Sequence, residues 1–202
     1  MKVVVCDADS LFGHTTRALL LHLAHEGVVR LQWSRLILEE STRALRKMGR
    51  FATREARLAH LAAIETALPQ ALVPVIEVQR HWSAVWRATD TSDQHVAACA
   101  VAVRALGRVE ADSPVFIATK NTRDFKAKKL LALGIVPQKP DTVLLDLLHT
   151  HPEAFAAAFR KYRLARKTPQ EVLPLIERLR VDLNRGTSAA LLAHHEAGTL
   201  LL

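Results

Sequence analysis

One stretch, Lys2-Val3-Val4-Val5-Cys6-Asp7-Ala8-Asp9, decides how the rest of the sequence is interpreted. Its apolar part, Val3–Cys6, has the length of a buried strand and is too short for a signal peptide. Asp7 ends this apolar run. Ligands of open α/β sheets bind at the carboxyl ends of strands, so Asp7 is a candidate for such a site. The alternative is a turn residue, because Asp is common where strands end.

Outward from this stretch, short apolar segments alternate with segments of helical periodicity. Further strands are predicted at Val28–Trp33, Val73–Val78 (in spite of Pro74), Val115–Thr119 and Ile135–Gln138. Helices are predicted at Thr15–His25, from an N-cap at Ser34 to Met48, and at Thr53–Leu68, Asp93–Leu106 and Phe125–Leu133, the last closed by Gly134. Strands that alternate with crossover helices form a parallel sheet, so the sequence predicts the α/β class.

Beyond Gln138 the sequence predicts helices only. The clearest segments are Asp141–Leu148, Pro152–Lys167 and Pro169–Arg180. The last begins with Thr168-Pro169-Gln170-Glu171, the pattern of a capping box with proline in the first helical position. We therefore expect one α/β domain over residues 1–140 and a helical C-terminal extension over residues 141–202 that packs on it.

Composition and charge limit the class of protein. Half of the 202 residues are hydrophobic, and no apolar run reaches the roughly 18–20 residues that span a bilayer. We expect a cytoplasmic protein without a membrane partner, in which Cys6 and Cys99 are free thiols in the core. The formal net charge is +8, and basic residues are densest between Arg160 and Lys167. This charge favours a polyanion or an acidic protein as partner.

Two predicted helices carry acids on their apolar sides. Glu40 shares a helix face with Leu36 and Ile37, where a charge needs a partner or a metal ion. The alternative for Glu40 is an acid at the edge of the core, paired with a basic residue. Asp93 opens the helix Asp93–Leu106 and lies along its apolar stripe. The alternative for Asp93 is helix capping, because an acid in the first turn is stabilised by the helix dipole.

Two polar residues, Asn121 and Asp124, follow the strand Val115–Thr119, again at a carboxyl end, although both residue types are ordinary in loops. Carboxylates that gather at one edge of a sheet repel each other, and a hard divalent cation relieves this repulsion. Mg²⁺ or Mn²⁺ suits a set of oxygen ligands, and such a metal can polarise a phosphodiester and activate water. The acids as a set therefore indicate a Mg²⁺ or Mn²⁺ site.

Four stretches have the order and spacing of a known family. They are Val4-Val5-Cys6-Asp7-Ala8-Asp9, Trp33-Ser34-Arg35-Leu36-Ile37-Leu38-Glu39-Glu40, Asp90-Thr91-Ser92-Asp93-Gln94-His95-Val96 and Thr119-Lys120-Asn121-Thr122-Arg123-Asp124-Phe125. Over about residues 2–138 the chain thus resembles the PIN-domain nucleases, in particular the longer VapC-type toxins with a helical C-terminal extension. The resemblance implies a three-layer α/β/α fold with a central parallel sheet. It also implies a metal-dependent endoribonuclease that is inhibited by a cognate antitoxin.

The resemblance also implies roles for individual residues. At the family's fourth acid this chain has Asn121, and Asp124 is the nearby alternative. Asp9 stands where many members carry Asn, as a further ligand or as the acceptor of a backbone hydrogen bond. The predicted catalytic residues are Asp7, Glu40, Asp93 and Asp124. The predicted metal ligands are Asp7, Glu40, Asp93 and Asn121. The predicted substrate-binding residues are Asp9, Arg17, Thr119 and His95.

Two other functions stay open at this point. The segment Asp7-Ala8-Asp9 also resembles the aspartate-nucleophile motif of haloacid-dehalogenase-type phosphatases, with Lys120 as the later lysine, but no convincing acidic pair follows a strand after it. The departure at Asn121 permits a catalytically decayed PIN domain that only binds RNA or protein. The expected partners are an RNA substrate, a cognate antitoxin and a second copy of the chain, which the apolar helices after Leu144 could contact.

Overall fold

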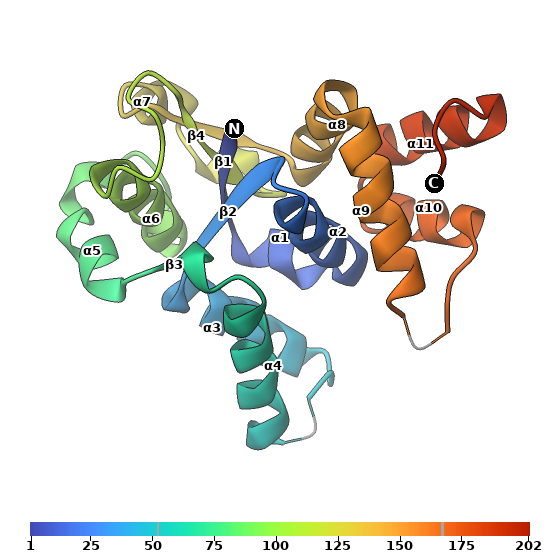
Figure 1. Ribbon diagram of the computed structural model, residues 1–202. Coiled ribbons are helices and arrows are strands. Elements are labelled where there is room, and N and C mark those ends of the chain that lie inside the picture. The colour runs from blue at the N-terminus through green and yellow to red at the C-terminus, as the bar shows by residue number, and fades with distance from the viewer. Residues whose placement is uncertain (52, 167) are drawn as a thin grey trace. The chain divides into compact units, whose positions relative to one another are not determined.

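A parallel sheet forms the centre of the fold (Figure 1). The computed structural model describes residues 1–51, 53–166 and 168–202. Within these residues the sheet has five strands in the order β3-β2-β1-β4-β5. Their bounds are β1 (Lys2–Cys6), β2 (Val29–Ser34), β3 (Leu72–Val73), β4 (Val115–Ala118) and β5 (Ile135–Gln138). The predicted α/β/α class, with a parallel sheet and C-terminal helices, is confirmed.

Strand β1 lies in the middle of the sheet because its sequence is apolar on both faces. The side chains of Val4, Val5 and Cys6 are fully buried. The strand order reverses at β1, since β2 pairs on one side of it and the chain returns as β4 on the other. Such a reversal is the point at which open α/β sheets bind ligands. The fold therefore places the carboxyl end of β1 at the expected site.

Helices connect the strands and continue beyond the sheet. They are α1 (Ala8–Phe12), α2 (His14–His25), α3 (Arg35–Lys47), α4 (Arg54–Ala67), α5 (Val75–Arg80), α6 (Gln94–Ala105), α7 (Ala127–Leu131), α8 (Pro140–Thr150), α9 (Pro152–Leu164), α10 (Val172–Val181) and α11 (Arg185–Ala197). The predicted N-cap at Ser34 is confirmed, because its hydroxyl accepts a hydrogen bond from the amide of Ile37. Among the described helices, none is long and apolar enough to cross a membrane.

Two predicted segments are wrong, and both lie next to prolines. Of the residues predicted as the strand Val73–Val78, Val73 ends β3, but Val75–Val78 belong to α5, because Pro74 precedes the first turn and leaves Val75 and Val78 on one helix face. The predicted capping box before α10 does not form. Gln170 instead exchanges two backbone-directed hydrogen bonds with Arg163 of α9, so α10 begins only at Val172.

One predicted helix is shorter than expected, and one helix of the C-terminal part was not expected. The predicted helix Pro152–Lys167 begins as expected but ends at Leu164, and Lys167 lies outside the described residues. Cys6 and Cys99 are both buried and free, as predicted. Helix α11 was not predicted, because Gly186 near its start gives the sequence no clear helical beginning.

The contacts divide the chain into two compact units. One, which we call the sheet unit, consists of residues 2–12 and 30–138. In it α6 packs on β1 and β4, and α1 packs on α3. The other, which we call the helical unit, consists of Met1 and residues 13–29 and 139–202. The boundary near residue 140 is thus also a boundary of contacts, but α2, from the first part of the chain, groups with the C-terminal helices.

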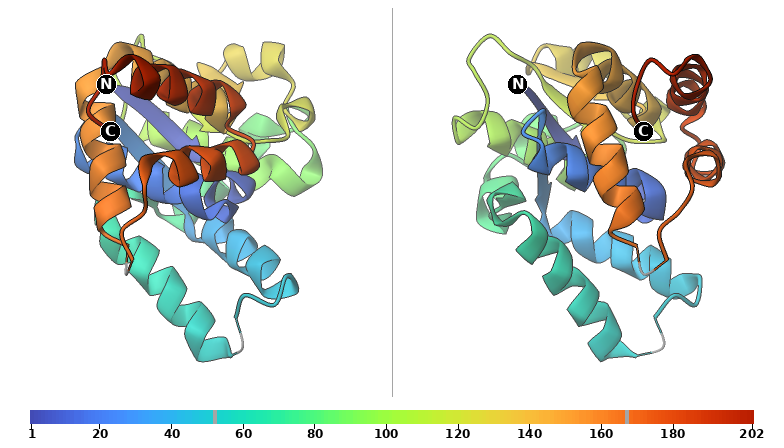
Figure 2. Two further views of the ribbon diagram at one scale, coloured as in Figure 1. Left: turned by 90° about the vertical axis from the view of Figure 1, so that its right-hand side faces the viewer. Right: turned by 45° about the vertical axis from the view of Figure 1, so that its right-hand side comes forward.

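Within the helical unit, α2 lies beside α9 and also contacts α10, while α11 contacts α8 and α10 (Figure 2). Two aspartates from other segments cap these helices. The carboxylate of Asp182 accepts hydrogen bonds from the amides of Thr15 and Thr16 at the start of α2, at 3.0 and 3.2 Å. Asp141 accepts bonds of 2.8 Å from the amides of Gly186 and Thr187 at the start of α11. Each cap satisfies donors that a helix N-terminus leaves open.

Candidate functional site

The candidate site begins where β1 and β4 end side by side. The register pairs Cys6 with Ala118, so the next residues, Asp7 and Thr119, leave the sheet at the same edge. The amide of Asp7 donates to the carbonyl of Ala118 at 3.0 Å. The hydroxyl of Ser10 donates to the same carbonyl at 2.6 Å. These bonds fix the first turn of α1 against the end of β4, and with it the position of Asp7.

Asp9 ties this turn to the loop after β4. Its carboxylate accepts hydrogen bonds from the amide of Lys120 at 2.7 Å and from the hydroxyl of Thr119 at 3.4 Å. Thr119 in turn accepts a bond from the amide of Asn121 at 3.1 Å. Of the two roles considered for Asp9, the structure shows the acceptor of a backbone hydrogen bond. Asp9 and Thr119 therefore position the loop that carries Asn121.

A short pairing of two loops brings Asp124 to the start of α6. Thr89 forms an antiparallel bridge with Phe125, and the amide of Asp90 donates to the carbonyl of Asp124 at 3.0 Å. We call this pairing the clasp. Asp93 follows three residues after Asp90 and precedes α6, but its side chain makes no capping hydrogen bond. Asp93 stands at the N-cap position of α6, so the alternative considered for it, stabilisation by the helix dipole, stays open.

Asn121 and Asp124 contact each other directly. The side-chain amide of Asn121 donates to the Oδ2 of Asp124. The two candidates for the fourth acid position thus lie together. Asn121 offers a neutral amide oxygen, and Asp124 offers a carboxylate. The structure brings both to the site, and the choice between them stays a prediction.

Glu40 of α3 meets His95 in the first turn of α6. The Oε2 of Glu40 lies 3.0 Å from the Nε2 of His95. Neither atom has a hydrogen-bond partner elsewhere among the described residues. The pairing with a basic residue that we considered for Glu40 is therefore present. It does not exclude a role in metal binding, because an ion pair at an edge can exchange partners.

Burial and mutual repulsion raise the proton affinity of these acids. Burial, then the neighbouring charges of Asp9 and Asp93, raises the pKa of Asp7 to about 7. Burial, followed by the charges of Asp124 and Glu40, also raises the pKa of Asp93. These effects show that the carboxylates from β1, α3, α6 and the loop after β4 are close enough to influence each other.

The contact between Glu40 and His95 shifts the pKa values of both residues. The contact with His95 lowers the pKa of Glu40 in spite of burial. Burial alone would lower the pKa of His95, but the contact with Glu40 and the charges of Glu40 and Asp7 outweigh it, so the pKa of His95 is raised. The contact therefore favours the charged forms of both partners, the carboxylate of Glu40 and the imidazolium of His95.

The donor set fits a hard divalent cation by its chemistry. Carboxylate and amide oxygens are the preferred ligands of Mg²⁺ and Mn²⁺. Burial raises the pKa of the Cys6 thiol to about 12, so in the metal-free protein the sulfur next to Asp7 stays protonated. Within residues 1–51, 53–166 and 168–202, no three His, Cys, Asp or Glu side chains already surround one point as a metal site would. A cation would have to draw these carboxylates together.

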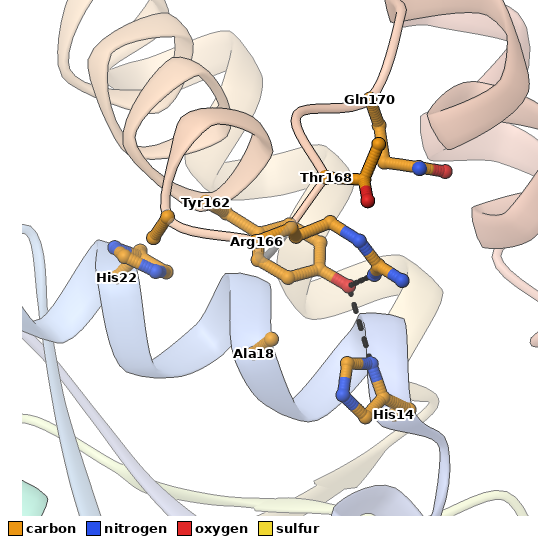
Figure 3. Close-up of a pocket in the computed structure, with 8 residues that line it drawn as sticks. His14, Ala18, His22, Tyr162, Arg166, Thr168 and Gln170 are labelled. Atoms are coloured by element: carbon orange, nitrogen blue, oxygen red, sulfur yellow. Dashed lines mark hydrogen bonds between the residues drawn. The ribbon is translucent and has the colours of Figure 1, made fainter.

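One predicted substrate-binding residue, Arg17, lies in the helical unit, where its neighbours include Tyr162 and Asp182. A cavity of about 580 Å³ opens in the same unit between α2 and the end of α9. Figure 3 shows the hydroxyl of Tyr162 between His14 and Arg166. Arg166 donates to this hydroxyl at 3.0 Å, and the hydroxyl lies 3.2 Å from the Nδ1 of His14. The role predicted for Arg17 stays a prediction.

The sequence reasoning missed a second cavity, of about 500 Å³, that adjoins the acids within the sheet unit. Its walls include Trp86, Arg87, Thr89, Ser92 and Lys126. No periodic pattern marks these residues, because they come from a turn, the clasp and the loop before α6. The local sequence signal that could have indicated this cavity was the pair Trp86-Arg87, an aromatic residue directly before a basic one.

Comparison with known proteins agrees with this geometry. The family model of the PIN domain matches residues 4–107, a little over half of the chain. The chain therefore belongs to the PIN-domain family, whose members are in general nucleases that act on nucleic acids and typically use divalent metal ions. Searches of curated proteins and of solved structures returned no significant match.

Proposed function

We propose that this protein is a metal-dependent endoribonuclease that hydrolyses RNA phosphodiesters. The observation that carries the proposal is the meeting of five acids at one edge of the sheet: Asp7, Asp9, Glu40, Asp93 and Asp124. Burial and then the neighbouring carboxylates raise the pKa values of Asp7 and Asp93, so the charged forms of these acids are costly in the absence of a cation. Membership of a nuclease family supports the same reading.

In this proposal Asp7, Glu40, Asp93 and Asn121 hold Mg²⁺ or Mn²⁺, and Asp124 completes the set as a catalytic acid. When bound, the cation supplies Lewis-acid activation of the phosphodiester and of the attacking water. Asp9 and Thr119 position the loop after β4 through the hydrogen bonds described above. His95, which the site favours as a cation, faces a substrate phosphate, and Arg17 contributes to substrate binding.

Cleavage of RNA by the purified protein tests this function. We expect discrete fragments with Mg²⁺ or Mn²⁺, no cleavage with a chelator, and loss of cleavage in Asp7→Asn. Asp112→Asn is the matched control, because Asp112 is an exposed acid in the same unit. Intact RNA with either metal, from folded wild-type protein, would contradict the proposal. RNA binding that survives in both variants would then favour a decayed PIN domain.

We further propose that the protein is a VapC-type toxin, located in the cytoplasm and inhibited by a cognate antitoxin. An arginine of that partner could pair with the acid cluster as charge-assisted hydrogen bonds allow. A homodimer through the helices after Leu144 belongs to the same proposal. Induction in a bacterial host, wild type beside Asp7→Asn, tests the toxin role. Growth arrest and RNA fragments with wild type alone are expected, whereas normal growth in both would contradict it.

The phosphatase alternative gains no support from the site. The backbone amide of Lys120 donates a hydrogen bond to Asp9, so this lysine is placed by its main chain beside the second aspartate and not beside Asp7. Turnover of small phosphate esters by the purified protein is the measurement that would revive this alternative. We expect none.

A further inference from the structure

The cavity beside the acid cluster carries the further inference. Its volume of about 500 Å³ lies within the range of small-molecule sites. The clasp connects it to the acids, because Thr89 and Asp90 belong both to the cavity wall and to the pairing with the segment around Asp124. Asp93 follows directly after the wall residues Thr91 and Ser92. A ligand in this cavity would therefore lie next to the proposed catalytic residues.

A strained turn presents two side chains at the cavity. Val85–Ala88 form a β-turn, in which the amide of Ala88 donates to the carbonyl of Val85 at 2.9 Å. Trp86 has φ −54° and ψ 126°, and Arg87 has φ 61°, the angles of a type II turn. Glycine is favoured at the second position, because a Cβ is strained at positive φ. Arginine at this place keeps a charged side chain at the cavity in spite of that strain.

The side chains of this turn suit a nucleotide. Trp86 is 65% exposed, which is unusual for so large an apolar ring. Exposed aromatic rings beside cations are typical of sites where bases of single-stranded nucleic acids stack. Arg87 and Lys126 are exposed basic residues of the cavity, against one acid, Asp90. The balance favours a phosphate group.

The wall also contains an unsatisfied polar group. Thr89 is only 4% exposed, and its Oγ1 has no hydrogen-bond partner within the described residues. A buried hydroxyl without a partner is costly, and groups of this kind are rare in folded proteins. A ligand that supplies the partner would remove the cost.

We propose that this cavity binds one nucleotide of a single-stranded RNA, with its base stacked on Trp86, its phosphate held by Arg87 and Lys126, and a polar group bonded to Thr89. This inference rests on the proposed nuclease function, for which it names the subsite that places the strand beside the acids. It is a binding role, so it can be measured without cleavage.

Binding of a short unstructured RNA, labelled for fluorescence anisotropy, tests the inference. All variants are made in the Asp7→Asn background with a chelator present, so that no RNA is cut. Trp86→Ala is expected to weaken binding roughly 5- to 100-fold, the effect of losing one base-stacking contact. Trp86→Phe, which keeps a ring, is expected to retain most of the affinity. Ile76→Ala, at another exposed apolar residue of the sheet unit, is expected to leave it unchanged.

Two further variants separate binding from structural roles. Arg87→Gly relieves the strain of the turn, and Thr89→Val removes the unpaired hydroxyl while keeping the shape. Both are therefore expected to raise the melting temperature of the free protein and to weaken RNA binding several-fold. A purely structural role for these residues would move both quantities in the same direction.

The outcomes distinguish this inference from the proposed function. RNA binding that depends on Trp86, in a wild-type protein that cuts no RNA, would support the subsite and contradict the nuclease. Cleavage by wild type together with equal RNA affinity of Asp7→Asn and Asp7→Asn/Trp86→Ala would support the nuclease and overturn the subsite. Equal affinity is the expected result if the turn instead contacts a protein partner.

Discussion

The acid cluster of the sheet unit and the Tyr162 cavity of the helical unit gather charges of opposite sign, and burial acts on them in opposite directions. In the first, burial and neighbouring carboxylates raise the pKa of Asp7 to about 7. In the second, burial and the neighbouring charges of Arg17 and Arg166 lower the pKa of His14. Each site favours the neutral form of one group, the buried carboxyl of Asp7 in the first and the more exposed imidazole of His14 in the second.

The two sites differ in the partners that the protein provides for these groups. The hydroxyl of Tyr162 accepts a hydrogen bond from Arg166, so its own proton is available to the Nδ1 of His14. A neutral histidine is thus satisfied by the protein itself. The carboxyl of Asp7 accepts a hydrogen bond from the amide of Ala8, but burial and the charges of Asp9 and Asp93 oppose its ionised form. The comparison therefore favours the acid cluster, and not the cationic cavity, as the place where the proposed cation binds.

The largest expected effect that tests this difference between the two sites is on the rate of RNA cleavage. Asp93→Asn keeps the size of the side chain and removes one charge from the cluster. We expect RNA cleavage to fall roughly a thousandfold, since loss of a single preorganised stabilising group costs roughly 10²- to 10³-fold in rate. Single-turnover cleavage with Mg²⁺ measures it, with Asp112→Asn as control. A loss below tenfold would remove Asp93 from the proposed site.

The next effect concerns stability and its dependence on pH. The folded-state pKa of Asp7, about 7, lies above its usual value of 3.8, so the folded protein holds this proton more tightly than the unfolded chain. Stability of the metal-free protein should therefore fall as pH rises from about 4 to about 7. Asp7→Asn removes the penalty, and we expect it to stabilise the metal-free protein by roughly 2–4 kcal/mol at pH 8 and little at pH 4.

Unfolding by denaturant with a chelator, at both pH values, checks this expectation. Added Mg²⁺ should then stabilise wild type and leave Asp7→Asn almost unchanged, because ligands stabilise only the state that binds them. Equal destabilisation of Asp7→Asn at pH 4 and pH 8 would mean that Asp7 is a structural residue and would contradict a cation site at the acid cluster.

A smaller effect concerns the helix cap that Asp141 provides within the helical unit. Asp141→Ala leaves the amides of Gly186 and Thr187 without an acceptor. We expect a loss of about 1–2 kcal/mol in the free energy of unfolding, the value of a helix cap. Glu196→Ala, at an exposed acid on α11, is the control. If both variants unfold at the same denaturant concentration as wild type, the cap is not a determinant of stability.

The smallest effect concerns His14. Arg166→Gln removes both a neighbouring cation and the donor to Tyr162, so the pKa of His14 should rise toward its usual value. Titration of the histidine ring by nuclear magnetic resonance measures this shift. A pKa of His14 that stays the same or falls would show that burial alone keeps it neutral.

Much of the fold could be predicted because it depends on local patterns. The apolar run before Asp7 and the N-cap at Ser34 each carry their own signal, and both were found at the expected places. Acids at strand ends were predictable for the same reason. The partner of each acid was not, because the contact of Glu40 with His95 joins residues more than fifty positions apart. The clasp and the Trp86 turn depend on backbone pairing that leaves no periodic trace.

Helix α2 has a consequence for how the chain is made. It is synthesised early, directly after α1, yet its packing partners α9 and α10 come more than a hundred residues later. At usual rates of translation this is a delay on the order of ten seconds. During that time α2 lacks the helices with which it packs, and three of its leucines, Leu19, Leu20 and Leu23, are fully buried only in the finished protein. A growing chain of this protein should therefore bind chaperones until its last helices leave the ribosome, and a message cut short before α9 should yield an aggregating product.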